Sequence, residues 1–465
     1  MEMTATTTAK ATGSMRALRT HFDSGAMRSY TARRAALKAL KASIRKYEEE
    51  LLAAMHTDMR KPRFEAYMSE IGLVLGTIDH ALEHLKEWMK PAAVHTPLAI
   101  QVSQSKVYME PLGVVLIIGP WNYPALLLLS PLAGAIAAGN CAVLKPSEDA
   151  PATARVIERI VREAFAQEHV AVVHGHGAEV VPQLMQDFRF DHVFFTGSPA
   201  VGRKVMALAA EKLVPVTLEL GGKCPAIVDR TADVKAAARR IAWSKYFNAG
   251  QTCIATDHAL VHTSVMDEFL TAFAKYVKRF YGDDPQQSPD YARMIHARRF
   301  DTVKGYLEQG TVHIGGQHDA SDRYIAPAVL TNVSLESAVL REEIFGPVLP
   351  AIPWNEREEV IAITQRNPHP LAAYIFSSDR KAQRYFRERI AFGGGCINHC
   401  MLQFGPHDLP FGGVGSSGMG RYHGHMTFDL FSNQKGMVHA STVIDPAVQY
   451  PPYNKFKEKV LRRVL

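Results

Sequence analysis

Apolar residues in the first part of the chain, from residue 18 to residue 90, recur at spacings of three and four. One such series is Leu37, Leu40, Ile44, Tyr47 and Leu51. An α-helix completes a turn in 3.6 residues, so this spacing gathers the apolar side chains on one face. We therefore predict that the chain opens with helices.

A different pattern follows the prolines at positions 91 and 97. Residues 101–108, with the sequence QVSQSKVY, alternate between polar and apolar side chains. A period of two is typical of a strand that has one face in water, and the prolines interrupt the preceding helix. This stretch is expected to form an exposed strand or hairpin.

Short apolar runs alternate with helical stretches further along the chain. The runs lie at 113–119, 141–144, 170–173 and 192–195. Apolar runs of this length indicate strands buried on both faces, and their alternation with helices is typical of a parallel, doubly wound sheet. A second α/β series begins near 224–228 and continues past Val348, which puts a domain boundary at about Gly221 and Gly222.

The apolar stretch 125–144 is long enough to cross a membrane, but it is interrupted. The interrupting residues are Ser130, Pro131, Gly134, Gly139 and Asn140. A buried helix followed by a strand fits this pattern better, so no transmembrane segment is expected. The first 20 residues lack the apolar core of a secretory signal, and a frayed tail is expected there.

Composition places the chain among globular proteins of two or three domains. It has 465 residues, of which 47% are apolar and 21% are charged. The net charge of +7 comes from Lys and Arg residues that are mixed with acids along the chain, so a nucleic-acid partner is not expected.

The five cysteines are an odd number scattered along the chain, which is typical of reduced thiols in a cytoplasmic protein. Cys396 and Cys400, with His399 between them, lack the spacing and the second ligand pair of a zinc site. No metal site is expected.

Cys253 lies in the segment NAGQTCIAT, among small and amide residues and without a histidine beside it. A free cysteine is most often a small buried hydrophobic residue, so this segment alone does not indicate chemistry. The rest of the chain has to decide whether the thiol reacts.

Two further polar residues stand in unusual places. Glu219 lies inside the apolar run VTLELGG, where burial would raise its pKa towards that of a general base. Asn122 lies in the turn GPWNYP after a predicted strand, where its amide could donate to an oxyanion. An asparagine that satisfies its own turn backbone is the alternative for Asn122, and this segment alone favours that alternative.

Phosphate binding is indicated weakly at residues 194–202, where an apolar strand leads through a Gly-Ser turn into a helix. Lys145 and Glu148 follow another predicted strand and could meet a ribose or a phosphate, but this segment alone favours a surface charge pair. The sequence GVGSSG at 413–418 has the dinucleotide-binding spacing but no preceding apolar strand, so a structural turn is the better interpretation.

Seven segments together resemble the aldehyde dehydrogenase superfamily, and they occur in the family's order. They are PWNYP at 120–124, AGN and VLKPSE within 138–148, FTGSPAVG at 195–202, VTLELGGK at 216–223, GQTC at 250–253, EEIFGPV at 342–348 and LPFGGVGSSGMGRYHG at 409–424. The length of the chain, the WNYP, LELGGK and RYHG segments and the YPPY at 450–453 further resemble the class 3 branch. The fold that this implies has two doubly wound α/β domains and a small bridging β-hairpin.

The resemblance implies roles for individual residues. Cys253 would be the nucleophile, Glu219 the general base, and Asn122 the oxyanion donor together with the Cys253 backbone N–H. The residues that would contact NAD or NADP are Trp121, Lys145, Glu148, Gly197, Ser198, Gly202, Glu343 and Phe345. Glu148 would favour NAD, while Lys145 could tolerate the phosphate of NADP, so the choice of cofactor stays open.

The resemblance also implies a domain organisation. Residues 1–95 and 117–220 would form the cofactor-binding domain, residues 221–408 the catalytic domain, residues 96–116 and 409–436 the bridging segments, and residues 437–465 a C-terminal tail. The bridging hairpin would serve dimerisation, so a homodimer is expected.

The expected activity is oxidation of an aldehyde to a carboxylic acid through a thiohemiacetal and a thioester on Cys253. An apolar entrance formed by Tyr67, Trp243, Tyr246, Phe247 and the loop 399–404 would favour long-chain or aromatic aldehydes, although core packing explains these residues nearly as well. The alternatives are an acylating dehydrogenase that transfers the thioester to coenzyme A and a thiol hydrolase or esterase without a cofactor.

Overall fold

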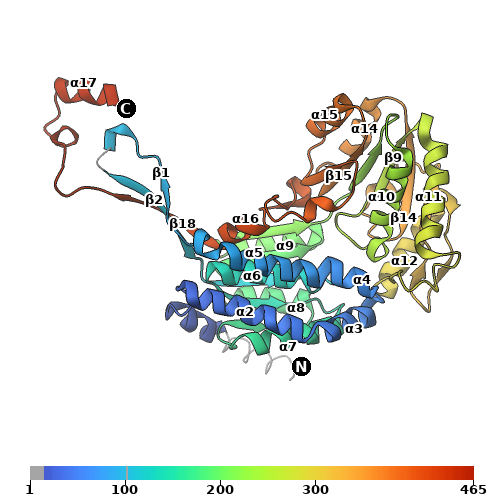
Figure 1. The fold of residues 1–465 in the computed structure, drawn as a ribbon, viewed down its shortest axis with the longest axis horizontal. Coiled ribbons are helices and arrows are strands. Elements are labelled where there is room, and N and C mark those ends of the chain that lie inside the picture. The colour runs from blue at the N-terminus through green and yellow to red at the C-terminus, as the bar shows by residue number, and fades with distance from the viewer. Residues whose placement is uncertain (1–14, 101–102, 465) are drawn as a thin grey trace.

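The computed structural model describes residues 15–100 and 103–464, which form two α/β lobes and a protruding arm (Figure 1). One lobe is built on a six-stranded sheet, the other on a seven-stranded sheet, and the arm contains a three-stranded sheet. Most of the expected N-terminal tail lies outside the described residues. Its last part is ordered, because residues 15–20 are helical and Met15 and Leu18 are buried.

The six-stranded sheet has the strand order β17-β7-β6-β3-β4-β5. Its strands are β3 (Val114–Ile118), β4 (Cys141–Lys145), β5 (Val170–Val172), β6 (His192–Gly197), β7 (Val216–Leu220) and β17 (Gly418–Met419). All neighbours pair in parallel except β17, which is antiparallel to β7. The chain runs outward from β3 to β5 and returns to β6 beside β3, so the predicted double winding is confirmed. Ligands bind such sheets at the carboxyl ends of the strands where the winding reverses, which here is between β3 and β6.

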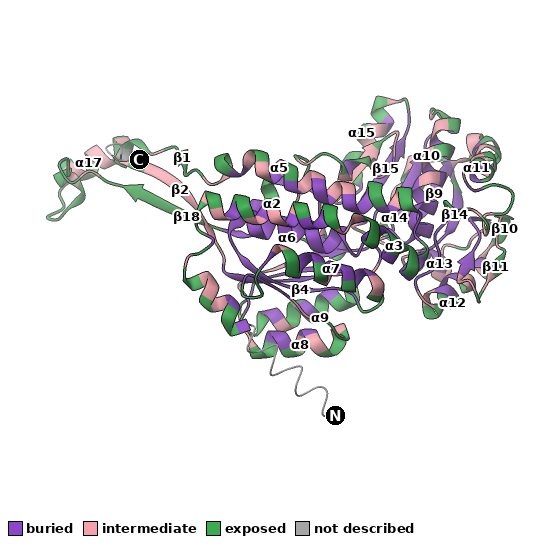
Figure 2. Cartoon of the chain, turned by 60° about the horizontal axis from the view of Figure 1, so that its bottom comes forward, coloured by how far each residue is buried: buried purple, intermediate pink, exposed green. Residues whose placement is uncertain are grey.

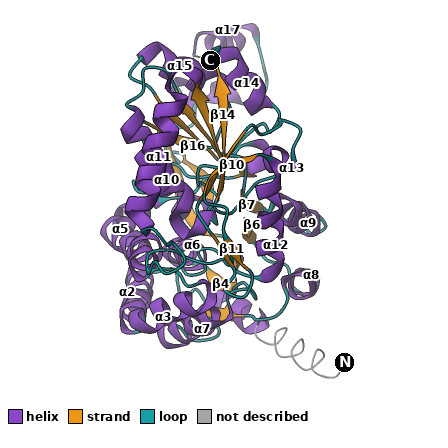
Figure 3. Cartoon of the chain, turned by 90° about the vertical axis from the view of Figure 1, so that its right-hand side faces the viewer, coloured by secondary structure: helices purple, strands orange, loops and turns teal. Residues whose placement is uncertain are grey.

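Helices cover both faces of this sheet (Figure 3). One face carries α2 (Tyr30–Lys46), α3 (Glu48–Met59), α5 (Gly72–Trp88), α6 (Leu126–Ala138) and α7 (Pro151–Ala164), and the other carries α8 (Gly177–Asp187) and α9 (Pro199–Ala210). The helical opening is confirmed, since Leu37, Leu40 and Ile44 are buried on one face of α2. Every residue of α6 is buried. Among the described residues, no helix is long and apolar enough to cross a membrane.

The seven-stranded sheet has the order β10-β13-β14-β9-β8-β15-β16 and is parallel except at the edge strand β10. Its strands are β8 (Pro225–Val228), β9 (His258–His262), β10 (Thr311–Ile314), β13 (Ala328–Thr331), β14 (Val348–Trp354), β15 (Ala372–Phe376) and β16 (Gly394–Ile397). The helices of this lobe are α10 (Val234–Tyr246), α11 (Met266–Tyr281), α12 (Ala297–Tyr306), α13 (Ala338–Arg341), α14 (Arg357–Gln365) and α15 (Arg380–Arg389). The hairpin β11 (His318–Asp319) and β12 (Tyr324–Ile325) completes it.

The arm is the expected hairpin with one strand added. β1 (Ala92–Val94) and β2 (Gln104–Pro111) pair antiparallel, and β18 (Ser432–His439) pairs with the other side of β2. The strand expected at 101–108 is therefore present from Gln104, while residues 101 and 102 lie outside the described part of the chain. Most of β18 is exposed, and the helix α17 (Lys455–Val464) lies at the end of the arm (Figure 2).

The structure places two segments differently from the expected domain boundaries. Val114–Ile118 is a strand of the six-stranded sheet, so the expected boundary between residues 116 and 117 cuts through β3. Within 409–436, β17 pairs with β7 and α16 (Gly424–Leu430) packs on α5 and α6, so only β18 belongs to the arm. The continuous apolar run at 113–119 itself predicts a strand buried in the doubly wound sheet, and the pairing of β3 with β4 and β6 agrees with that prediction.

Candidate active site

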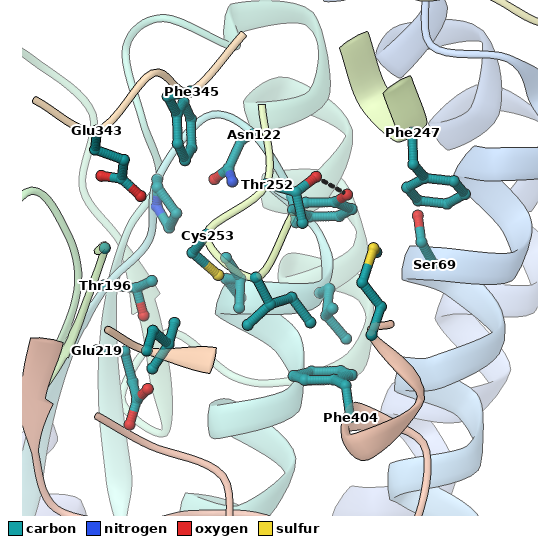
Figure 4. A pocket seen from close by; sticks show the side chains of 18 of the residues that line it. Ser69, Asn122, Thr196, Glu219, Phe247, Thr252, Cys253, Glu343, Phe345 and Phe404 are labelled. Carbon is teal, nitrogen blue, oxygen red and sulfur yellow. Dashed lines mark hydrogen bonds between the residues drawn. The ribbon is translucent and has the colours of Figure 1, made fainter. Parts of the chain in front are cut away.

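A cavity of about 1140 Å³ lies between the two sheets. The six-stranded sheet contributes residues that follow β3, β6 and β7, and the seven-stranded sheet contributes residues that precede β9, β14 and β15. The carboxyl edge of one sheet thus faces the amino edge of the other. Cys253, Glu219 and Asn122 all line this cavity (Figure 4).

Cys253 is carried by an unusually shaped loop between α10 and β9. Asn248 and Ala249 have φ values of +53° and +51°, which only a few per cent of non-glycine residues adopt. Gly250 follows with a φ of +76°, and a Cβ atom there would lie 2.4 Å from the Gly346 carbonyl oxygen. Only glycine allows this approach, which brings the loop of Cys253 against the loop that carries Phe345.

Asn122 is buried in the turn after β3. Its side-chain amide donates a hydrogen bond to the Gln251 carbonyl oxygen at 3.0 Å. The alternative of an asparagine that satisfies its own turn backbone is therefore not what the structure shows. The amide instead reaches the loop of the thiol.

Glu219 lies near the end of β7 and lines the cavity (Figure 4). Both carboxyl oxygens are buried, and neither has a hydrogen-bond partner among the described residues. Burial holds the pKa of Glu219 well above its ordinary value, and the Arg421 charge opposes this effect. An unpartnered buried acid is uncommon and indicates a group held for chemistry.

The Cys253 thiol is strongly disfavoured as a thiolate in the protein alone. Burial is the largest cause, and the Glu343 and Glu219 carboxylates add to it, so that the pKa of Cys253 rises to about 12. The backbone N–H groups of Cys253 and Ile254 act in the opposite direction. Deprotonation therefore requires additional positive charge or a base in the cavity.

Glu343 and Phe345 lie on the loop that precedes β14. The Glu343 carboxylate accepts a hydrogen bond from Gly222 N–H at 3.1 Å, and burial raises its pKa to about 7. Phe345 has a φ of +45°, a strained value for a bulky residue, and its ring meets Trp121 edge to face at 5.5 Å. Both aromatic rings line the cavity.

Gly197 and Ser198 line the cavity at the start of α9. The Ser198 hydroxyl caps the helix by accepting a weak hydrogen bond from Val201 N–H at 3.4 Å. The amino end of a helix attracts phosphate through its unpaired N–H groups, so this place suits a pyrophosphate. Gly202 does not line the cavity, and a Cβ atom there would lie 2.8 Å from the Leu220 side chain, so it packs α9 against the sheet.

Lys145 and Glu148 form an ion pair at the end of β4, outside the lining of the cavity. The Lys145 Nζ donates to a Glu148 oxygen at 2.8 Å, and the other Glu148 oxygen accepts from Gly177 N–H at 2.8 Å. Lys145 is buried, whereas Glu148 is exposed. Both groups therefore stand on the carboxyl edge of the sheet, two strands from Gly197.

The expected apolar entrance is present in part. Trp243, Phe247 and the loop residues His399, Met401, Leu402 and Phe404 line the cavity. Two expected residues do not: Tyr67 points outward and is 45% exposed, and Tyr246 is buried with its hydroxyl donating to the Ala328 carbonyl oxygen. The spacing of apolar residues in the sequence could not show that Tyr67 and Tyr246 lie on sides of their helices that do not face the cavity.

Several cavity residues were missed from the sequence. The Thr252 and Tyr123 hydroxyls are 2.5 Å apart beside Cys253, and the buried Thr196 hydroxyl has no hydrogen-bond partner among the residues that the structure describes (Figure 4). The Arg299 guanidinium donates to the Glu343 and Ile344 carbonyl oxygens and so supports the loop before β14. Thr196 and Thr252 lie inside the motifs FTGSPAVG and GQTC, so their positions were available from the sequence. The partners of Arg299 are more than 40 positions away along the chain, and no sequence pattern indicated that contact.

Comparisons with known proteins agree with this geometry. A sequence model described as "Aldehyde dehydrogenase family" matches residues 1–437. A 4,4'-diaponeurosporen-aldehyde dehydrogenase from Staphylococcus aureus is 45% identical over 94% of this chain and 95% of its own length. Aldehyde dehydrogenase family 3 member B1 from Rattus norvegicus is 44% identical over 96% and 95% of the two chains.

Solved structures give the same result. The substrate-bound Staphylococcus aureus AldH superposes with a TM-score of 0.95 at 43% identity and covers 97% of this chain and 98% of its own. An indole-3-acetaldehyde dehydrogenase complexed with NAD⁺ superposes with a TM-score of 0.85 at 28% identity, over 93% of this chain and 89% of its own. These comparisons confirm the expected fold class. They also confirm the resemblance to the family and to its class 3 members, and a cofactor of the NAD or NADP type. This chain belongs to the aldehyde dehydrogenase family of NAD(P)-dependent enzymes.

Proposed function

We propose that this enzyme oxidises a long-chain aliphatic or aromatic aldehyde through a covalent thioester on Cys253. The observation that carries the proposal is the unpartnered, buried Glu219 carboxyl group in the same cavity as the Cys253 thiol and the Asn122 amide. A nucleophile, a base and an oxyanion donor are the three groups that acyl chemistry requires.

The residues around the cavity fit a nicotinamide dinucleotide. The amino end of α9 with Gly197 and Ser198 suits a pyrophosphate, the Trp121 and Phe345 rings offer apolar faces, and Glu343, Lys145 and Glu148 offer polar groups for riboses. When bound, NAD or NADP supplies the acceptor for the hydride that the aldehyde carbon loses.

The first half of the reaction uses Cys253 and Asn122. The Cys253 thiol first releases its proton to solvent, and the sulfur then attacks the carbonyl carbon and forms a tetrahedral adduct whose oxygen carries negative charge. The second N–H of the Asn122 amide and the Cys253 backbone N–H are the donors for that oxygen, and one such donor typically lowers the barrier by about 2.7–4 kcal/mol. Loss of hydride then leaves the acyl group as a thioester on Cys253.

The second half uses Glu219. Its raised pKa makes the ionised carboxylate a stronger base than an exposed glutamate. It takes a proton from a water molecule, the resulting hydroxide attacks the thioester carbon, and the carboxylic acid leaves while the Cys253 thiol is restored. Because its oxygens have no fixed partner, Glu219 can turn towards that water.

Both alternative activities receive less support. A coenzyme A-dependent acyl transfer would not need Glu219 as a water-activating base. A thiol hydrolase needs a histidine beside the thiol, but the cavity histidines His296 and His399 bond to backbone groups through Nδ1, and among the described residues none bonds to Cys253.

The assembly and the location of the enzyme complete the proposal. The three-stranded sheet of the arm exposes Met437 and Val438 on β18, which suits pairing with a second copy, so we propose a homodimer. The five unpaired cysteines fit the reducing cytoplasm.

A kinetic matrix tests the proposal: purified enzyme is given aldehydes of increasing chain length with NAD or NADP, and reduced nicotinamide is followed by absorbance. We expect turnover that rises with chain length. No turnover with any aldehyde would overturn the proposal, and turnover only with coenzyme A present would establish the acylating alternative.

A further inference from the structure

A buried ion pair lies behind the turn that carries Asn122. The Lys61 Nζ is 2.5 Å from a Glu70 carboxylate oxygen, and both side chains are 0% exposed. Lys61 stands just after α3, and Glu70 stands in the π-helical turn Tyr67–Ile71 that follows the short helix α4 (Arg63–Ala66). Neither residue lines the cavity.

The two residues hold the turn 119–125 from both sides. The Lys61 ammonium donates to the Asn122 carbonyl oxygen at 3.0 Å and lies 4.0 Å from the centre of the Tyr123 ring. The Glu70 carboxylate accepts from Ala125 N–H at 2.8 Å and from Leu126 N–H at 3.3 Å, at the amino end of α6. The ion pair thus connects the middle of the segment between β3 and α6 to the end of that segment at α6.

The Asn122 carbonyl oxygen receives a second donor from the loop of the thiol. Asn248 Nδ2 donates to it at 3.1 Å and also to the Gln251 carbonyl oxygen at 3.2 Å. Because Lys61 and Asn248 approach the same oxygen, the peptide group of Asn122 has little freedom to rotate. Holding this peptide group fixes the Cα–Cβ bond of Asn122, and the bond to the Gln251 carbonyl oxygen fixes the amide at the end of the side chain.

Packing alone does not account for the pair. Removing two charges from water is costly, and apolar residues of similar volume often stabilise a core as well as a buried ion pair does. The buried Lys61 ammonium donates to the Asn122 carbonyl oxygen and so restrains the backbone of the active-site turn. An apolar pair could not make this bond.

We propose that Lys61, held by Glu70, is a positioning residue that aims the Asn122 amide at the oxyanion. This inference rests on the proposed function, because it assigns Lys61 to the step in which the tetrahedral oxyanion forms. Lys61 acts through Asn122 and touches neither the substrate nor the cofactor. It should therefore matter for aldehyde addition and leave the intrinsic reactivity of the thiol unchanged.

A double-mutant cycle tests the inference, with the rate of the first-turnover hydride burst as the readout. Lys61→Met should slow the burst roughly 10- to 100-fold in the otherwise native enzyme. In the Asn122→Ala background the amide that Lys61 positions is absent, so the same change should slow the burst less than about twofold. An equal loss in both backgrounds, or no loss in either, would overturn the inference.

Three further measurements separate a positioning role of Lys61 from a general loss of stability: the alkylation rate of Cys253 in Lys61→Met, and the melting temperature and burst rate of Arg33→Met. Iodoacetamide reacts with a thiol without forming an oxyanion, so its rate with Cys253 should be the same in the native and Lys61→Met enzymes. Arg33→Met removes another buried cation, which donates to the Ala137 carbonyl oxygen at the far end of α6. It should lower the melting temperature and leave the burst rate unchanged, and an equal loss of burst in Arg33→Met would contradict the inference.

If Lys61→Met does not fold, the variant Lys61→Met/Glu70→Gln removes both charges and keeps an acceptor for Ala125 N–H. A stable double variant with a native burst rate would show that the pair is structural only. Native turnover of aldehyde is measured first, so failure of the proposed function is visible independently of the Lys61 result.

Discussion

The Asn122 amide donates to the Gln251 carbonyl oxygen at 3.0 Å, and this bond joins the turn after β3 to the loop that carries Cys253. The two residues are 129 positions apart and belong to different lobes. The oxyanion donor and the loop of the nucleophile are therefore joined by a direct bond between the two lobes.

Asn122→Ala should slow the hydride burst by about 100- to 1000-fold, because one donor to the developing oxyanion is lost. The dissociation constant of the cofactor, measured by fluorescence titration, should stay within about twofold, since the Asn122 amide is not assigned to cofactor binding. Asn332→Gly, at an exposed asparagine with positive φ in the other lobe, is the control and should keep the native rate. A native burst in Asn122→Ala would remove Asn122 from the mechanism.

Glu219→Gln should separate the two halves of the reaction. The amide cannot accept a proton from water, so thioester hydrolysis should slow by roughly 100- to 10,000-fold while the burst of one hydride per active site remains. Stopped-flow absorbance gives the burst and the steady-state rate in one trace. If the steady-state rate were unchanged, another group would have to activate the water.

Glu219 should also make stability depend on pH. Its pKa in the folded protein lies well above the ordinary value of 4.5. Between these two pKa values the folded state binds more protons than the unfolded state, so stability falls as pH rises from about 4.5. Glu219→Gln removes this loss of stability. The melting temperature of the variant minus that of the native protein should therefore increase from pH 5 to pH 8. Glu308→Gln, at an exposed position, should show no such trend.

The reactivity of Cys253 should report its surroundings. With a thiol pKa of about 12, the rate of alkylation by iodoacetamide in the cofactor-free enzyme should rise about tenfold per pH unit and show no plateau up to pH 10. Glu343→Gln should raise the rate above about pH 7, where the Glu343 carboxyl group is ionised, because Glu343 is the carboxylate that raises the thiol pKa most. Glu342→Gln changes the neighbouring residue, whose partner is the Tyr306 hydroxyl, and should leave the rate unchanged. A plateau near pH 8 would show that the thiol ionises more easily than its burial implies.

Gly250→Ala should damage the loop of the thiol. The added Cβ atom would meet the Gly346 carbonyl oxygen at 2.4 Å in a backbone conformation that alanine rarely adopts. We expect a loss of about 1–3 kcal/mol in the free energy of unfolding and a slower burst. Gly305→Ala is the matched control on helix α12, where nothing lies within 4 Å, and it should be neutral or stabilising by up to about 1 kcal/mol.

The sequence predicted those parts of the structure that depend on local pattern. Apolar runs identified the strands β3, β4, β5 and β6, and three- and four-residue spacing identified the opening helices. The motifs around Cys253, Glu219 and Asn122 identified groups that the structure brings into one cavity. Periodicity could not show that Tyr246 points into the core or that Tyr67 points to solvent, because that depends on which neighbouring element each helix packs against. Lys61 and Glu70 were missed because two charged residues near a helix end resemble an ordinary exposed pair.

The apolar end of the cavity should set the preference for aldehyde chain length. Phe247 and Phe404 both line it, Phe247 on the segment after α10 and Phe404 on the loop after β16. An aldehyde too short to reach these rings gains nothing from them, whereas a longer chain gains roughly 0.8 kcal/mol for each buried methylene. Phe404→Ala should therefore lower kcat/KM for long-chain aldehydes by about 10- to 100-fold and leave that for acetaldehyde within about twofold. Tyr67→Ala is the control, since its exposed ring lies outside the cavity, and it should not change the chain-length profile. An equal loss for short and long aldehydes in Phe404→Ala would mean that the ring supports the fold of the loop and does not contact the substrate.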